Sequence, residues 1–233
     1  MTNADRITPL SKLPNFDPRQ VPVVGVDRHL PPVSLDALRP DALLARFANP
    51  PAWEPELRSE PRFTERKTAH AAVLIPLVMR PEPTLLLTRR TAHMSTHSGQ
   101  VAFPGGKVDE TDASHEAAAL REAQEEVGLD PHWVHIAGAL PTYTTGTAFI
   151  VTPVVGLVRP GFDLTPNPQE VADVFEVPLA FLMDPANHRR HQLEAEGLLR
   201  QWFSMPYQDG AHERFIWGAT AGMLRNLYRF LSA

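Results

Sequence analysis

The sequence predicts an α/β fold, in which apolar strands and amphipathic helices share a core. Two observations support this class. Continuous apolar runs of strand length lie at 71–78, 85–90 and 149–158, and helical spacing of apolar residues is found at 121–129 and 220–231. A period near 3.6 residues indicates a helix, and a short apolar run bounded by turn residues is typical of a buried strand. With 233 residues, of which 43% are hydrophobic, the chain suits one domain with additions or two small domains.

The composition argues against several classes of protein. A formal net charge of -5 argues against a protein that mainly grips a nucleic-acid backbone, although a small anionic ligand needs only a local basic patch. The chain has no cysteine, which excludes disulfides and thiolate metal sites and fits a reducing compartment. No apolar run approaches the roughly 18 residues that cross a bilayer. We therefore expect a cytoplasmic protein with a small-molecule ligand, and with neither nucleic acid nor a membrane as partner.

The chain is predicted to divide into an N-terminal arm with short helices at 1–69 and a main domain at 70–233. The first half of the arm is rich in proline, which favours a segment that lies on the surface or is partly disordered. An edge strand is expected at 22–26. One or two short helices follow, and Ser34 and Asp41 are candidate N-caps because such side chains accept hydrogen bonds from helix N–H groups.

Within the main domain, the runs 71–78 and 85–90 are joined by the turn-like stretch 80–83 and predict a hairpin. Gly128, followed by an Asp-Pro pair two residues later, predicts the end of the helix before it. The other expected elements are a short strand at 100–103, strands at 132–140 and 149–158, a strand-to-helix passage at 166–185, strand or helix-entry segments at 201–207 and 214–219, and a closing helix at 220–231. The polar segment 187–201 is assigned to no element.

Three carboxylates gather on one face of the helix at 121–129. Glu122, Glu125 and Glu126 stand at i, i+3 and i+4, and only Arg121 lies nearby as a cation. The repulsion between them, a few tenths of a kcal/mol for each like-charged pair, is expected to be largely uncompensated. Such a face favours a hard divalent cation such as Mg2+, which is commonly held by carboxylates together with substrate phosphates. The alternative is a solvated acidic face with no ligand.

The segment 105–129, GGKVDETDASHEAAALREAQEEVGL, resembles the box of the Nudix hydrolases, G-x5-E-x7-R-E-U-x-E-E-x-G-U, where U is aliphatic. The match from Arg121 to Leu129 is complete except at the first aliphatic position, which holds Ala123. Fourteen residues separate Gly106 from Arg121, one more than in the general box. The position of the early glutamate therefore holds Asp112, and its supporting role falls to either Asp112 or Glu116.

The segment upstream resembles the signature of the coenzyme A pyrophosphatase branch of that superfamily, L-L-T-x-R-S-x-x-x-R-x-H-x-G-x-x-x-F-P-G-G. Residues 86–106 read LLTRRTAHMSTHSGQVAFPGG. The positions on pattern are Arg90, His97, Gly99, Phe103, Pro104, Gly105 and Gly106. Thr91 replaces the serine and Ser95 replaces the second arginine. The later stretches NPQEVADVFEVPLAFL and FIWGATA are also similar, so the resemblance covers roughly 70–230.

The resemblance implies a Nudix α/β/α sandwich, with a mixed sheet between helices. It also implies Mg2+- or Mn2+-dependent hydrolysis, with Glu122, Glu125 and Glu126 as metal ligands and Glu122 and Glu125 as catalytic residues. The carbonyl of Gly106 is expected to face an ion, because a residue without Cβ lets the main chain turn towards it. Arg121 is expected to orient a ligand carboxylate.

Glu170, in the NPQEV loop, is a candidate accessory metal ligand or general base, since Nudix enzymes often draw that group from outside the box. The alternatives are that Glu170 merely caps the segment after it, or that a box glutamate is the base.

For the substrate, the resemblance implies coenzyme A or its acyl derivatives, cleaved to 3',5'-ADP and 4'-phosphopantetheine. Arg89, Arg90, His97 and Lys107 cluster near the loop that would face the 3'-phosphate. Arg90 and His97 are its preferred partners, and Gly99 and Lys107 are further candidates for substrate binding. The alternative for Arg90 is a solvated side chain at the end of a strand. Two other functions stay open: a Nudix hydrolase of a nucleotide sugar or dinucleotide, and a non-catalytic nucleotide-binding module of the same fold.

Overall fold

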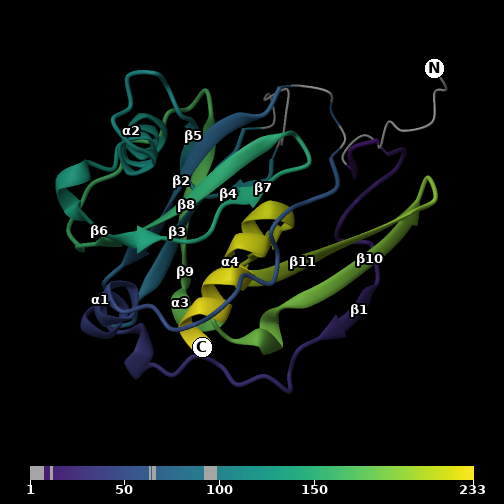
Figure 1. Cartoon of the computed structure of the whole chain (residues 1–233), viewed down its shortest axis with the longest axis horizontal. Helices are drawn as coiled ribbons and strands as arrows, with labels where there is room; N and C mark the ends of the chain where they lie inside the picture. The colour runs from purple at the N-terminus through teal and green to yellow at the C-terminus, as the bar shows by residue number, and fades with distance from the viewer. Residues whose placement is uncertain (1–7, 11–12, 63, 65–66, 92–98) are drawn as a thin grey trace.

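The computed structural model describes residues 8–10, 13–62, 64, 67–91 and 99–233. Its elements form two sheets, with one helix on the outer face of the larger sheet and another between the sheets (Figure 1). The described helices include none that is both long and apolar enough to span a membrane.

The larger sheet has eight strands and contains both parallel and antiparallel pairs. Its strands are β2 (Ala69–Val78), β3 (Thr84–Arg90), β4 (Val101–Ala102), β5 (Gly105–Lys107), β6 (Val134–Ala139), β7 (Tyr143–Thr144), β8 (Phe149–Val158) and β9 (Val171–Pro178). The main path runs β4-β3-β2-β8-β6, with β5 on β2, β7 on β8 and β9 on β3. Among the described strands, β2 and β8 pair in parallel, and the other strand pairs of this sheet are antiparallel. The expected mixed sheet is therefore confirmed, as is the hairpin of β2 and β3.

The long strands of this sheet are buried on both faces. Along β2, Ala72 and Leu74 pack towards one core cluster, while Ile75 and Leu77 pack towards the other. Successive side chains of a strand point to opposite faces, so a strand with helices on both sides needs apolar residues at every position. This explains why the sequence shows continuous apolar runs there instead of alternation.

Helix α2 (His115–Val127) covers one face of the larger sheet and carries the three glutamates. It begins where the Ser114 hydroxyl accepts a hydrogen bond from the Ala117 N–H, at 3.2 Å. It ends at Gly128, which has φ +72, in the left-handed region that favours glycine. A Cβ at Gly128 would also lie 2.7 Å from the backbone nitrogen of Thr165. The predicted helix and its end at Gly128 are confirmed.

Helix α4 (Gly218–Ser232) lies on the other face, between the two sheets (Figure 1). Four apolar residues of this helix are buried: Met223, Leu224, Leu227 and Leu231. They belong to the same core cluster as residues of β2, β3, β8 and β11. The predicted closing helix is therefore confirmed.

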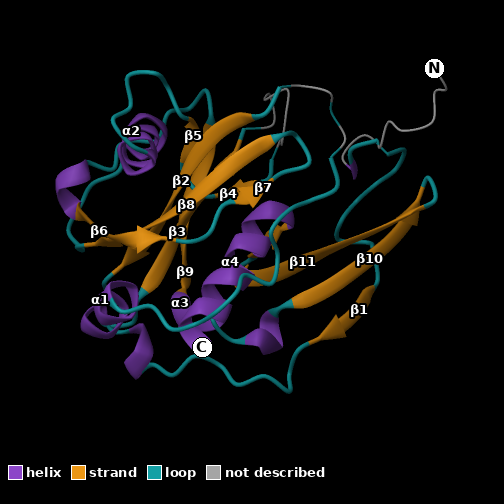
Figure 2. Cartoon of the chain, viewed as in Figure 1, coloured by secondary structure: helices purple, strands orange, loops and turns teal. Residues whose placement is uncertain are grey.

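The second sheet has four described strands, all antiparallel, in the order β1-β10-β11-β12. Figure 2 shows β1, β10 and β11 side by side. They are β1 (Val23–Val26), β10 (Arg189–Ala195), β11 (Leu198–Asp209) and β12 (His212–Trp217). The predicted edge strand at 22–26 is confirmed. Segment 187–201, for which no element is predicted, forms β10 and the start of β11. Its inward-facing residues include His191 and Arg200, so the usual apolar alternation is missing.

The remaining helices are short. They are η2 (Asp36–Leu38), α1 (Pro40–Ala48), η3 (Pro131–Trp133), α3 (Leu179–Leu182) and η4 (Pro185–Asn187). Leu35, and not Ser34, is at the N-cap position of η2, although the Ser34 hydroxyl accepts a hydrogen bond from the Ala37 N–H at 3.3 Å. Asp41 is not an N-cap, because α1 begins one residue earlier, with Pro40 in its first turn and Arg39 as the extended residue before it.

The N-terminal stretch shares a sheet with the main domain, because β1 pairs with β10. Asp27, directly after β1, is buried and bonds Arg225 of α4 at 2.8 Å. The division at residue 69 stays a prediction about folding units.

Candidate active site

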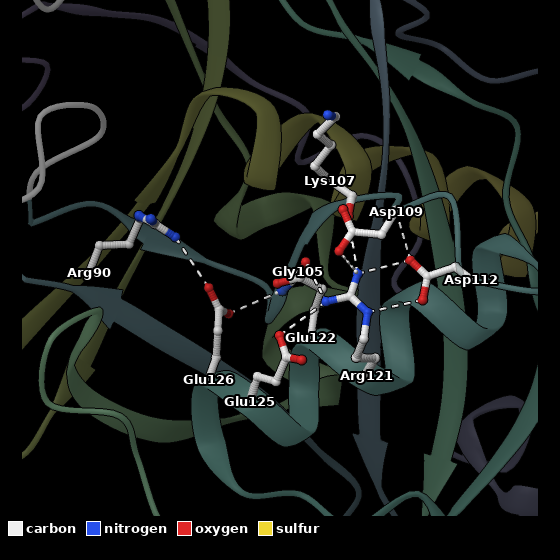
Figure 3. A network of polar contacts seen from close by, with 9 residues as sticks. All are labelled: Arg90, Gly105, Lys107, Asp109, Asp112, Arg121, Glu122, Glu125 and Glu126. Carbon is white, nitrogen blue, oxygen red and sulfur yellow. Dashed lines mark hydrogen bonds and ion pairs between the residues drawn. The ribbon is translucent and has the colours of Figure 1, made fainter.

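The three glutamates of α2 differ strongly in exposure. The side chain of Glu125 is 60% exposed, that of Glu122 is 17% exposed and that of Glu126 is 5% exposed. They project from the helix towards β5 and the end of β3, where Gly105 and Arg90 lie beside them (Figure 3).

Arg121 holds two of these carboxylates. Its Nη1 donates to Glu122 Oε1 and to Glu125 Oε2, both at 3.0 Å. The expectation that the repulsion goes largely uncompensated is therefore wrong. The expected orienting role of Arg121 agrees with these contacts (Figure 3).

The opposite side of the Arg121 guanidinium is held by Asp112. Nε and Nη2 of Arg121 each donate to one Asp112 oxygen at 2.9 Å, and the Asp109 N–H donates to Asp112 at 2.8 Å. These bonds, led by that from Arg121, lower the pKa of Asp112 to about 2. Glu116 instead bonds Ser114 at the start of α2. Of the two candidates for the early supporting position, Asp112 is the one that contacts Arg121.

Glu126 is a buried carboxylate between a backbone donor and an arginine. It accepts a hydrogen bond from the Gly105 N–H at 3.1 Å, and Arg90 Nη1 lies 3.4 Å from its Oε1. Burial raises the pKa of Glu126 to about 7, although these two partners act in the opposite direction. Arg90 is 21% exposed and paired, so it is held in the cluster and is not simply solvated. Sequence alone does not indicate this contact, which depends on β3 ending beside α2.

Glu122 packs directly against Gly106, which pairs with Ala72 of β2. A Cβ at position 106 would lie 2.5 Å from the carboxylate atoms of Glu122, which is closer than real Cβ contacts. Burial raises the pKa of Glu122, and its bond with Arg121 opposes that rise. Only glycine leaves room for this carboxylate at the sheet edge.

Glu170 lies near the same cluster. Its negative charge contributes to the raised pKa of both Glu122 and Glu126. Its backbone N–H donates to the Asn167 carbonyl at 3.1 Å, and its carbonyl accepts from the Thr91 N–H at 2.9 Å. The turn before β9 is thus tied to the residue that follows Arg90, and this places Glu170 beside the box.

The other residues expected at the substrate are spread more widely. The side chain of Lys107 points away from the carboxylates, and only its carbonyl joins the network, by accepting from Arg121 at 3.2 Å (Figure 3). Gly99 has φ +68 and lines a cavity near the end of β3. His97 lies outside the described residues.

The donor set fits a hard divalent cation in its chemistry, because every candidate side chain offers carboxylate oxygen. The pKa values of Glu122 and Glu126 are raised mainly by burial, and neighbouring carboxylates add to the rise. In the part of the chain that the structure describes, no three His, Asp or Glu side chains converge closely enough to hold an ion. The carboxylate oxygens of the three box glutamates face Arg121 and Arg90, so a bound ion would replace these ion pairs.

Comparison with known proteins identifies the family of this chain. The model of the NUDIX domain family matches residues 68–201. An uncharacterized Nudix hydrolase, NudL, from Cronobacter sakazakii is 47% identical over 73% of this chain and 87% of its own length. The Nudix hydrolase NudL from Shigella flexneri is 44% identical over 80% of this chain and 92% of its own length. A solved MutT protein from Methanosarcina mazei is 25% identical, covers 51% of this chain and 83% of its own, and has a TM-score of 0.41. The chain belongs to the Nudix hydrolases, enzymes that act on nucleoside diphosphate derivatives.

Proposed function

We propose that this Nudix hydrolase cleaves the diphosphate of coenzyme A and its acyl derivatives, and releases 3',5'-ADP and 4'-phosphopantetheine or its acyl form. The observation that carries the proposal is the contact between Arg90 and Glu126, at 3.4 Å. Arg90 belongs to the upstream coenzyme A signature, and Glu126 belongs to the box. Their contact supports a single site in which the recognition segment adjoins the hydrolytic carboxylates.

Glu122, Glu125, Glu126 and the Gly106 carbonyl are the groups that would hold Mg2+ or Mn2+. Bound divalent ions would neutralise the diphosphate and lower the pKa of an attacking water. Glu122 is already positioned by Gly106, and Glu126 by the Gly105 N–H. Glu125 is mostly exposed and can turn from Arg121 towards a ligand.

Glu122 and Glu125 are the proposed catalytic residues of the box, and Glu170 is the proposed accessory ligand or general base. Its charge acts on both Glu122 and Glu126, which supports a place beside the reacting phosphate. A Glu170→Gln variant should lose most of its turnover. Turnover near wild type at every pH would leave Glu170 with a capping role only.

Arg90, His97, Gly99 and Lys107 are the proposed substrate contacts. Arg90 is the best supported, because an ion at Glu126 would release its guanidinium for a substrate phosphate. Charge-assisted bonds from a planar guanidinium suit a phosphate better than those from a lysine.

The test is a comparison of kcat/KM for coenzyme A, dephospho-coenzyme A, a nucleotide sugar and a dinucleotide, each with Mg2+ and with chelator. We expect coenzyme A to be the preferred substrate, with no turnover in chelator. Preference for the nucleotide sugar or the dinucleotide would assign the enzyme to another Nudix substrate. Tight nucleotide binding with no turnover of any substrate would indicate a non-catalytic module.

A further inference from the structure

A cavity of about 460 Å3 lies between the two sheets, near the end of β3. Three distant stretches of the chain line it: the N-terminal segment, the strands β3, β4 and β9 with the turn before β4, and strand β12. Its volume is within the range of small-molecule sites in proteins. The lining residues that the structure describes include none of the three box glutamates.

The cavity nevertheless begins one residue from the candidate active site. Arg89 and Arg90 are consecutive at the end of β3, where the register with β9 is irregular, and their side chains have different surroundings. Arg90 reaches Glu126, whereas Arg89 lines the cavity. The Arg90 N–H also donates to the carbonyl of Gln100, another lining residue, at 3.0 Å.

Among the lining residues that the structure describes, Arg89 is the one arginine without an ion-pair partner. Arg214 is paired with Asp173 and with Asp209, and Arg19 lies 3.6 Å from Glu213. Arg89 is exposed, and within the described ranges no carboxylate forms an ion pair with it. An anionic group entering the cavity would therefore meet a guanidinium that is free to bind it.

One wall of the cavity is aromatic. The rings of Phe16 and Trp217 both line it, and their centroids lie 6.0 Å apart. Both rings are only partly buried. Half-buried aromatic rings beside a cation suit a ligand that joins a flat base to a phosphate, because bases stack on aromatic side chains. Both residues lie outside the stretch that matches the NUDIX model.

We propose that this cavity binds an adenine nucleotide, with its base against Phe16 and Trp217 and a phosphate on Arg89. The choice of nucleotide rests on the proposed function, because 3',5'-ADP is the end of coenzyme A that carries both features. The nucleotide is either that end of the bound substrate or free 3',5'-ADP after release. The chemistry of recognition is the same in both cases.

The test is titration of the full-length protein with 3',5'-ADP in chelator, followed by calorimetry and by tryptophan fluorescence. We expect Arg89→Gln to weaken binding about tenfold or more, as loss of a charge-assisted bond does. Arg80→Gln is the matched control, since Arg80 lies at the opposite end of the β2–β3 hairpin and pairs with Glu176. Equal affinity of Arg89→Gln and wild type would overturn the proposal.

Trp217→Phe gives a second, local readout. It retains an aromatic ring, so we expect the calorimetric affinity to persist while the fluorescence change on binding is largely lost. A fluorescence change that persists in full in Trp217→Phe would place the nucleotide elsewhere and overturn the proposal.

Inhibition of hydrolysis by 3',5'-ADP distinguishes the two sources. Competitive inhibition that is lost in Arg89→Gln indicates the nucleotide end of the substrate, and noncompetitive inhibition that is lost in the same variant indicates free nucleotide. Failure of the proposed function gives a different result: Arg89-dependent binding of 3',5'-ADP with no hydrolysis of coenzyme A. If the enzyme hydrolyses coenzyme A but binds 3',5'-ADP equally well without Arg89, the cavity proposal fails and the proposed function stands.

Discussion

Gly106 and Glu122 are packed so closely that a Cβ on residue 106 would lie 2.5 Å from the carboxylate of Glu122. This contact joins the two halves of the Nudix box, because Gly106 is on β5 and Glu122 is on α2. Glycine is therefore required at position 106, because its missing Cβ leaves the space that the Glu122 carboxylate occupies. The backbone of Gly106 does not have a positive φ, so conformational freedom is not the reason.

Gly106→Ala should displace Glu122 and weaken both metal binding and turnover. We expect a loss of about 10- to 100-fold in metal affinity, the range seen when the support of a metal ligand is disturbed. Calorimetric titration with Mn2+ measures it directly. Gly25→Ala is the control, because the nearest atoms to its Cβ belong to the flexible end of Arg190. Equal metal affinity in Gly106→Ala and Gly25→Ala would contradict the packing account.

Glu126 should make the metal-free enzyme less stable as pH rises. Its folded-state pKa of about 7 exceeds the ordinary value of 4.5, so the folded state binds more protons between these values. The stability from this group is present below pH 4.5 and is lost as pH rises through 7. The loss is about 3 kcal/mol at most.

Urea unfolding of wild type and Glu126→Gln in chelator measures this effect between pH 5 and 8. The difference in unfolding free energy between the two proteins isolates the contribution of Glu126 from that of other groups. One of these is His188, whose pKa is lowered by burial to about 4. We expect the variant to gain stability relative to wild type as pH rises. A difference that stays constant across this range would show that Glu126 does not titrate there.

Asp112 and Glu116 should differ in their effect on catalysis. Asp112→Asn removes the charge that holds the outer side of Arg121, so the orientation of Glu122 and Glu125 should loosen. We expect kcat/KM to fall about tenfold. Glu116→Gln should leave kcat/KM close to wild type, because Glu116 bonds Ser114 and not Arg121. A larger loss in Glu116→Gln than in Asp112→Asn would reverse the assignment.

Arg225 should be important for stability and not for the site. It is 1% exposed and bonds Asp27 at 2.8 Å and Glu56 at 2.7 Å, which fixes the N-terminal stretch to α4. Arg225→Met should cost about 3 kcal/mol, because it removes the buried partner of Asp27 and leaves only the half-exposed Arg190, 3.0 Å away, to pair with it. Urea unfolding measures the stability of Arg225→Met and of the double variant that also carries Asp27→Asn. The comparison shows whether the charge of Asp27 causes the loss. We expect the double variant to recover much of the loss, and no recovery would rule out the unpaired charge as the reason.

Local sequence patterns predict the elements whose packing is apolar. The runs at β2, β3 and β8 and the helices α2 and α4 are found from the sequence because their buried residues are hydrophobic and regularly spaced. Strand β10 and the start of β11 are not found, since their inward-facing positions hold His191 and Arg200. His191 is satisfied by Ser204 Oγ at 2.7 Å and by the Val21 carbonyl at 2.9 Å, partners that no local pattern reveals.

Motif spacing predicts the identity of the box residues but not their partners. The positions of Glu122, Glu125 and Glu126 on one face follow from helical periodicity. The contacts with Arg90 and Asp112 depend on where β3 and the loop before α2 lie in space. For the same reason, the sequence leaves open which acid supports Arg121, whereas the structure identifies Asp112.

The most direct test of the central claim is product analysis after incubation of the purified enzyme with coenzyme A and Mg2+. We predict equal amounts of 3',5'-ADP and 4'-phosphopantetheine. We also predict that chelator and Glu125→Gln each abolish most of this product. Absence of 3',5'-ADP, while the same preparation cleaves another nucleoside diphosphate derivative, would contradict the account.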